Sequence, residues 1–415
     1  MVGVLSLGYN LRGAITSLPP VFPELQASLG LSGATISILA ATPVICFGVV
    51  SGFAAGLARR AGEERVLLGA SIALVAGLIA RGAAPGALLF PGTILCSGAI
   101  AIMNVLLSSL IKRRWPERAG FLIGLYITAL SAGAIVASLV SVPLWQDTGG
   151  SVALTLGWLA APAALAVLLW LPQARSRPRS QATTAAVRPA RVAVYKHAIT
   201  WHVTIFMGMQ SLLYYATLSW LPSMLRDRGE SAAAAGDLLA LMGVGNLAVS
   251  LFIPMIAQRM RSQVVLVVPT TIAVAGGLAG LLYLPLGGAV AWALILGAGQ
   301  NAALALAIFF TAARAPHAAA AASLSSMAQA VGYLLASAGP LEVGLLHSAT
   351  GSWTAPVMVL FALSGVMLVA GLLAARPRML PEEPAEPAPR AAPEPAPEPA
   401  PEPAPGTATE TEGTA

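Results

Sequence analysis

The chain is a succession of apolar stretches of about 20 residues, separated by short segments that hold turn residues or charges. A helix of about 20 apolar residues crosses the hydrocarbon core of a bilayer, and only helices or closed barrels can span it. Of the 415 residues, 57% are hydrophobic and 10% are charged, whereas about 25% of the residues of a soluble protein are charged. The sequence therefore predicts an all-α integral membrane protein.

Twelve such stretches can be distinguished. They cover residues 2–25, 33–58, 66–84, 86–111, 118–143, 152–171, 198–221, 235–258, 263–284, 287–312, 319–346 and 353–375. This spacing predicts twelve transmembrane helices in an N-terminal half (1–171) and a C-terminal half (198–376) of six helices each. A basic linker (172–197) joins the halves. The Pro-, Glu- and Ala-rich tail (377–415) offers nothing to bury and is expected to be disordered.

The positive charges are distributed unequally among the loops. Seven Lys and Arg residues follow the second and fourth stretches, and more lie in the linker, whereas only Arg81, Arg226 and Arg228 follow odd-numbered stretches. Cytoplasmic loops carry the excess of Lys and Arg. We therefore expect both termini to be cytoplasmic in a multi-pass, monomeric protein of the cytoplasmic (plasma) membrane. The net charge of +6 arises from these loops and does not indicate nucleic acid binding.

The two halves resemble each other at a shift of 199 residues. "LARRAGEERVLL" from Leu57 then lies over "IAQRMRSQVVLV" from Ile256, and the fifth and eleventh stretches pair Gly133 with Gly332. Parallel repeats of this kind in transporters place the substrate site near the bilayer midplane, between the halves.

Four segments of the sequence, taken together, resemble the major facilitator superfamily and, more narrowly, its cyanate and 2-nitroimidazole permeases (CynX/NimT). They are "NLRGAITSLPP", "MNVLLSSLIKRRWPERAGFLIGLYITALSAGA", "WHVTIFMGMQSLLYYATLSWLPSMLRDRG" and "QAVGYLLASAGPLEVGLLHSATGSW". The resemblance implies a secondary transporter that moves a cyanate-like anion or a nitro-heterocycle by alternating access. Two departures are Arg59, where the superfamily usually has Asp, and Ser348, where an acid is expected.

Arg12 is the residue that most needs explanation, because a charge at the centre of a lipid-facing helix costs roughly 2.5–3.5 kcal/mol on insertion scales. The resemblance implies that stretches one, four, seven and ten line a central cavity. Their polar residues lie at similar depths, about 12–18 Å from the cytoplasmic ends at 1.5 Å per residue. The predicted substrate-binding residues are Arg12, Asn10, Asn104, Gln210, Tyr214 and Asn301.

Several alternatives stay open for these residues. Glu342 could pair with Arg12, although about 9–12 Å of depth separates them, and Tyr214 could be a core aromatic. For Gln300, Gln329 and Tyr333, hydrogen bonds between helices are the favoured roles. If a proton couples to transport, Glu342 and His202 are the candidate carriers.

Other functions are less well supported. A broad-specificity drug exporter of the same superfamily is the alternative within transport, and a polytopic membrane enzyme the alternative outside it. The four histidines are far apart in sequence, and Cys46 and Cys96 belong to no Cys-x-x-Cys pair. We therefore expect no metal site, no cofactor and no catalytic residues.

The topology can be tested with single cysteines in a variant without Cys46 and Cys96. A cysteine at Gly229 should react with a membrane-impermeant maleimide in intact cells, because it follows an odd-numbered stretch. A cysteine at Ser176, in the linker, should react only after the cells are lysed. Labelling of Ser176→Cys in intact cells would reverse the orientation.

Overall fold

The computed structural model describes residues 1–175, 194–249, 252–260 and 262–381. Within these ranges the chain is helical and contains no β-strand. Most of the predicted linker and nearly all of the predicted tail lie outside the described residues, so the predictions for them are not tested by the structure.

The helices coincide with the predicted stretches. The first half of the chain forms α1 (Val2–Thr16), α2 (Phe22–Leu29), α3 (Gly33–Ala61), α4 (Glu63–Ala83), α5 (Pro85–Arg114), α6 (Ala119–Asp147), α7 (Val152–Gly157) and α8 (Ala160–Arg175). The second half forms α9 (Ala198–Asp227), α10 (Ala232–Val249), α11 (Phe252–Arg259), α12 (Val264–Tyr283), α13 (Ala289–Ala313), α14 (Ala318–Thr350) and α15 (Thr354–Ala374). The first and sixth stretches each contain two helices, and in the eighth α10 and α11 lie on either side of residues 250–251, which are outside the described ranges. In the first, Pro19 and Pro20 interrupt the helix, because proline has no backbone N–H to donate.

Nine helical segments of the described residues are long and apolar enough to cross a membrane. The first, seventh and eleventh stretches do not meet this criterion. Helix α1 has only 15 residues, whereas α9 and α14 are long enough, with 30 and 33 residues, but are not among the segments that also meet the hydropathy requirement. The structure thus shows a multi-pass helical membrane protein, and the number of twelve crossings remains a prediction.

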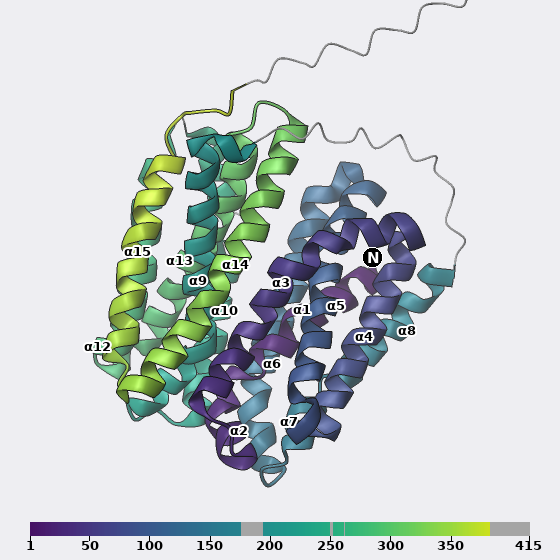
Figure 1. Ribbon diagram of the computed structural model, residues 1–415, viewed down its shortest axis with the longest axis vertical. Coiled ribbons are helices and arrows are strands. Elements are labelled where there is room, and N and C mark those ends of the chain that lie inside the picture. Colours follow the sequence, from purple (N-terminus) through teal and green to yellow (C-terminus); the bar gives the residue numbers. More distant parts are fainter. Residues whose placement is uncertain (176–193, 250–251, 261, 382–415) are drawn as a thin grey trace, which may run out of the picture. The chain divides into compact units, whose positions relative to one another are not determined.

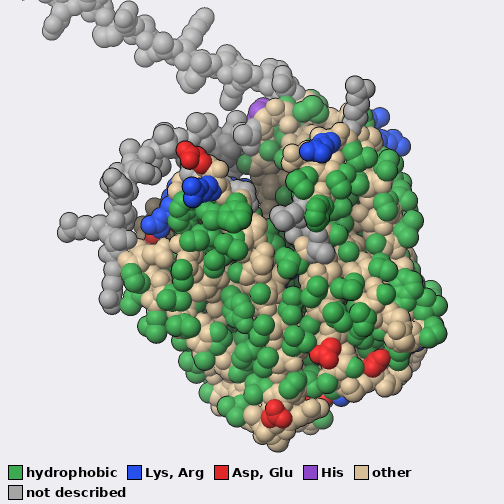
Figure 2. All heavy atoms as spheres, turned by 180° about the vertical axis from the view of Figure 1, so that it is seen from behind, with side chains coloured by type: hydrophobic (Ala, Val, Ile, Leu, Met, Phe, Trp, Pro, Cys, Tyr) green, Lys and Arg blue, Asp and Glu red, His purple; other side chains and the backbone are tan. Residues whose placement is uncertain are grey.

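The surface agrees with a position in the membrane. Figure 2 shows hydrophobic side chains covering the middle of one face, with most of the visible Lys and Arg near one end and most of the visible acidic side chains near the other. Large apolar side chains are exposed on several helices, including Phe53 (66%), Phe121 (74%) and Ile272 (65%). Lipid is the solvent that favours such exposure.

The helices are arranged as two bundles, which we call the N-terminal bundle (α1–α8) and the C-terminal bundle (α9–α15) (Figure 1). Their contacts are equivalent: α1 packs on α6 as α9 packs on α14, and α4 packs on α5 as α12 packs on α13. Between the bundles, α3 packs on α14 and α6 on α10. These two contacts are equivalent as well, because the repeat relates α3 to α10 and α14 to α6.

Two glycines fix the helix crossings that carry the site. A Cβ at Gly133 on α6 would overlap the carbonyl group of Tyr9 on α1, and one at Gly332 on α14 would lie 3.3 Å from the backbone nitrogen of Gly208 on α9. Small residues let membrane helices approach closely. Gly133 and Gly332 are separated by 199 residues, and so are Tyr9 and Gly208. Helices α1 and α9 therefore take equivalent places in the two bundles.

Arg81 is buried, although the sequence suggested only that it follows an odd-numbered stretch. Its side chain is 1% exposed and donates hydrogen bonds to the carbonyl oxygens of Ala14 (2.9 Å) and Leu156 (3.1 Å). The guanidinium thereby joins α4 to α1 and α7.

Replacing Arg81 with Met should therefore destabilise the protein. The variant loses two hydrogen bonds from a charged donor, each worth roughly 1.5–3 kcal/mol. The melting temperature of the purified protein should fall clearly. The exposed Arg60 supplies the matched control, Arg60→Met, for which we expect no change; equal effects at both positions would contradict a structural role for Arg81.

Candidate functional site

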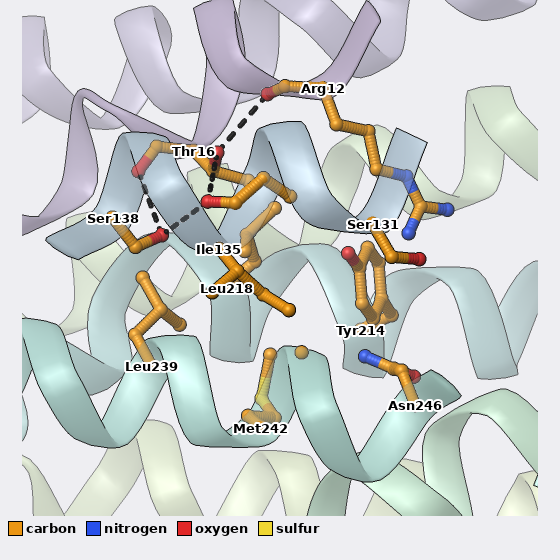
Figure 3. Close-up of a pocket in the computed structure, with 12 residues that line it drawn as sticks. Arg12, Thr16, Ser131, Ile135, Ser138, Tyr214, Leu218, Leu239, Met242 and Asn246 are labelled. Carbon is orange, nitrogen blue, oxygen red and sulfur yellow. Dashed lines mark hydrogen bonds between the residues drawn. The ribbon is translucent and has the colours of Figure 1, made fainter. Parts of the chain in front are cut away.

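Two adjoining cavities lie between the bundles, and Arg12 lines both. The first has about 340 Å³ of space free of protein atoms, including its open side, and its lining comes from α1, α6, α9 and α10 (Figure 3): Arg12, Thr16, Ser131, Ala134, Ile135, Ser138, Tyr214, Leu218, Leu239, Met242, Gly243 and Asn246. The second has about 360 Å³ of such space and is lined by Arg12, Gln210, Ser211, Tyr214, Tyr215, Asn246, Gln300, Asn301, Leu304 and Tyr333. Three of these residues are shared, so Arg12 stands where the two cavities meet.

The orientation of Arg12 follows from how α1 packs on α6. One turn after Arg12, the hydroxyl of Thr16 donates to the carbonyl oxygen of Ala134 on α6 (3.1 Å). The contact between Gly133 and Tyr9 holds the preceding turn. Helix α1 thus contacts α6 both before and after Arg12, and the Arg12 side chain extends toward Tyr214 and Ser131 (Figure 3).

The guanidinium of Arg12 has no anionic partner among the described residues. It forms no ion pair and donates no hydrogen bond within these ranges. Its one specific contact is with the ring of Tyr214, whose centroid lies 5.4 Å from the guanidinium carbon. A cation–π contact of this kind is worth about 2 kcal/mol when desolvated, whereas burying an ion costs several kcal/mol. The charge is therefore only partly compensated, and Glu342 does not pair with it.

An aromatic group forms one wall of the second cavity. The rings of Tyr214 and Tyr215 lie 5.0 Å apart, and the Tyr215 ring lies 6.5 Å from that of Tyr333 on α14. Phe47 on α3 packs behind Tyr215 and Tyr333 at 6.3 and 6.0 Å. Such a wall offers flat apolar surface together with phenol hydroxyls, which suits a small planar solute.

Amides form another part of the same cavity. Gln210 on α9 is 4% exposed, and its Nε2 donates to the Ser211 hydroxyl (2.6 Å) and the Met207 carbonyl oxygen (3.1 Å). Gln300 and Asn301 on α13 lie beside it in the lining. Together with Arg12, these groups can bind a solute that brings oxygen acceptors and polar hydrogens.

Four of the six predicted binding residues thus meet in one cavity: Arg12, Gln210, Tyr214 and Asn301. The other two are held elsewhere and line neither cavity. The amide nitrogen of Asn10 donates to the carbonyl oxygens of Ser6 (2.8 Å) and Pro162 (3.3 Å), and Asn104 accepts a hydrogen bond from the Tyr126 hydroxyl (3.0 Å).

The remaining candidates also lie apart from the cavity walls. Glu342 and His202 line neither cavity, so their role in proton coupling stays a prediction. Gln329 donates to Ser325 on its own helix, whereas Gln300 and Tyr333, expected to link helices, line the second cavity instead.

The sequence reasoning missed Asn246, Tyr215 and Ser131. It sought binding residues only on stretches one, four, seven and ten, whereas Ser131 lies on α6 and Asn246 on α10. Asn246 could have been noticed as an amide inside the eighth stretch. Tyr215 could not, because it neighbours Tyr214 in sequence and helical periodicity places neighbours on different faces.

Comparison with known proteins agrees with the geometry. Residues 5–340 match the Major Facilitator Superfamily. The chain is 36% identical to the 2-nitroimidazole transporter of Escherichia coli (strain K12), covering 91% of this chain and 95% of the relative. It is 29% identical to the cyanate transport protein CynX of the same organism, with 84% and 89% covered. Among solved structures, a D-xylose-proton symporter superposes with a TM-score of 0.69 at 17% identity, over 90% of this chain and 95% of the other.

The contrast between Arg12, which is partly buried at the cavity wall, and the fully buried Arg81 gives a prediction for the ligand-free protein. Arg12→Met keeps most of the apolar stem and removes an incompletely compensated charge. Its melting temperature should equal or exceed that of the wild type, whereas Arg81→Met should lower it. A marked loss of stability in Arg12→Met would show that Arg12 has a structural partner.

Proposed function

The chain belongs to the major facilitator superfamily, and on this basis we propose that it carries a small planar solute with an oxygen pair across the cytoplasmic membrane by alternating access. The family and the curated relatives are transporters. The chain is therefore a secondary transporter and not an enzyme. To this transporter function the proposal adds the class of solute and the mechanism of alternating access.

The observation that carries the substrate proposal is the unpaired guanidinium of Arg12. A ligand that brings negative charge or oxygen acceptors relieves the cost of burying this cation. The planar guanidinium binds two oxygens at once, as a nitro or carboxylate group presents them. The relatives are named for 2-nitroimidazole, which carries a nitro group, and for cyanate, a small anion. Because the aromatic wall favours a flat ring, we place a nitro-heterocycle or an aromatic carboxylate ahead of cyanate.

The polarity of the cavities favours this class over a broad range of hydrophobic drugs. One cation, Arg12, and four amides line the two cavities. Such groups select ligands that bring hydrogen-bonding partners. No observation favours the drug exporter that the sequence left open.

For the topology, we propose twelve crossings with both termini in the cytoplasm, in halves 1–171 and 198–376. The helices that match all twelve stretches support the count. The equivalent helix contacts of the two bundles support the division into halves. The excess of Lys and Arg in even-numbered loops supports the orientation.

For the mechanism, a contact at the rim of the bundles supports alternating access. Arg226 at the end of α9 donates to both carboxylate oxygens of Glu24 on α2, at 2.7 and 2.9 Å. The two side chains are 25% and 16% exposed, so the pair lies at the edge of the contact between the bundles. We infer that this link breaks and re-forms as the bundles rock about the site.

Transport by the purified protein in liposomes tests the proposal. The wild type should take up radiolabelled 2-nitroimidazole or benzoate above empty liposomes. Arg12→Met should reduce the initial rate at least tenfold, because the oxygen pair loses its partner. Arg12→Lys should also be poor, because the charge remains but the two-pronged geometry is lost.

Arg60→Met, at an exposed position, controls for effects of losing any arginine and should transport as the wild type does. Uptake by Arg12→Met at the wild-type rate would show that Arg12 does not bind the solute. Absence of uptake of every planar oxyanion and nitro compound by the wild type would refute the substrate class.

A further inference from the structure

Gln300 is the one cavity-lining residue whose whole side-chain amide is buried without a partner among the described residues. It is 2% exposed, and neither its Nε2 nor its Oε1 makes a hydrogen bond within these ranges. Its neighbour in the cavity, Gln210, differs, because the amide nitrogen of Gln210 is bonded to Ser211 and Met207. Gln300 therefore presents a free donor and a free acceptor side by side.

A buried amide without partners lowers stability, because both of its polar groups have lost water and gained nothing in exchange. An apolar side chain of the same shape would fold equally well or better at this position. Gln300 lines the same cavity as Arg12, so an amide without partners belongs to the wall of the space in which the solute is expected.

We propose that Gln300 binds the hydrogen-bonding edge of the substrate while Arg12 binds its oxygen pair. The inference rests on the proposed function and adds a second requirement to the substrate class. The solute needs a ring N–H, ring nitrogen or hydroxyl besides its nitro or carboxylate group. An amide suits this edge because it donates through nitrogen and accepts through oxygen.

Arg12 and Gln300 belong to different bundles, so a solute that binds both residues links the two bundles. Arg12 belongs to α1 in the N-terminal bundle, and Gln300 belongs to α13 in the C-terminal bundle. A solute with both groups is hydrogen-bonded to both bundles. A solute without the polar edge is hydrogen-bonded through Arg12 to the N-terminal bundle and meets the C-terminal bundle at the rings of Tyr214, Tyr215 and Tyr333. Gln300 thus selects among planar oxygen-bearing compounds.

Two pairs of compounds test the contact between Gln300 and the solute, because one member of each pair has the hydrogen-bonding edge and the other lacks it. They are 2-nitroimidazole with 2-nitrofuran, and 4-hydroxybenzoate with benzoate. Affinities are measured by calorimetric titration of the purified full-length protein. The wild type should bind the polar member of at least one pair about tenfold more tightly, which corresponds to about 1.4 kcal/mol.

In Gln300→Met this ratio should fall to about one, mainly through weaker binding of the polar member. The ligand-free melting temperature should not fall, because no hydrogen bond of the protein is lost. Gln329→Met removes an amide of the same size from an exposed position outside the cavities and should keep the wild-type ratio. If Gln300→Met cannot be purified in folded form, Gln300→Asn, which withdraws the amide by one methylene, should likewise lower the ratio.

The outcomes separate the two proposals. If the wild type binds both members of each pair equally, or if the Gln300 variants keep the wild-type ratio, Gln300 does not read the polar edge, while the proposed function stands. A lower ligand-free melting temperature in Gln300→Met would also count against the inference, because it would show that the amide is structurally satisfied. If the wild type binds no member of either pair, the proposed substrate class fails, and the inference fails with it.

Discussion

The site depends on a positive charge that the protein holds partly buried without giving it an anion. Arg12 rests on the face of Tyr214 and makes no ion pair among the described residues. Arg81 shows the alternative within the same chain, because its guanidinium is fixed by two backbone carbonyl oxygens and joins three helices. The two arginines are chemically identical, and only their partners differ. One is part of the scaffold, whereas the other keeps its binding capacity for something that enters the cavity.

The repeat explains how such a group is held in place. Gly133 with Tyr9 and Gly332 with Gly208 form equivalent crossings, 199 residues apart, so α1 and α9 face each other across the cavities. The position equivalent to Arg12 is Ser211, which also lines the second cavity. A nearly symmetric scaffold thus carries asymmetric chemistry, with the cation in the N-terminal bundle and the amides of Gln300 and Asn301 in the C-terminal bundle. A solute that needs both kinds of group is bound where the bundles meet.

The sequence predicted the helices well because length and hydropathy decide which segments suit a bilayer. Helical rise gives the depth of Arg12, Gln210, Tyr214 and Asn301, and these four predicted residues line one cavity. Depth does not fix the direction in which a side chain points. Asn10 lies at a suitable depth but bonds to Pro162 on α8, and Asn104 bonds to Tyr126 on α6. The direction depends on how helices distant in sequence pack, which no local pattern encodes, and for the same reason Gln300 was expected to link helices.

The most direct test of the unpaired charge is an experimental structure of the protein with 2-nitroimidazole or 4-hydroxybenzoate bound. Our account predicts that the nitro or carboxylate oxygens lie about 2.8 Å from the guanidinium nitrogens of Arg12, the distance of a charge-assisted hydrogen bond. The ring should lie against the tyrosines of the second cavity. A ligand bound elsewhere, with Arg12 hydrogen-bonded to a protein carboxylate, would contradict the central claim.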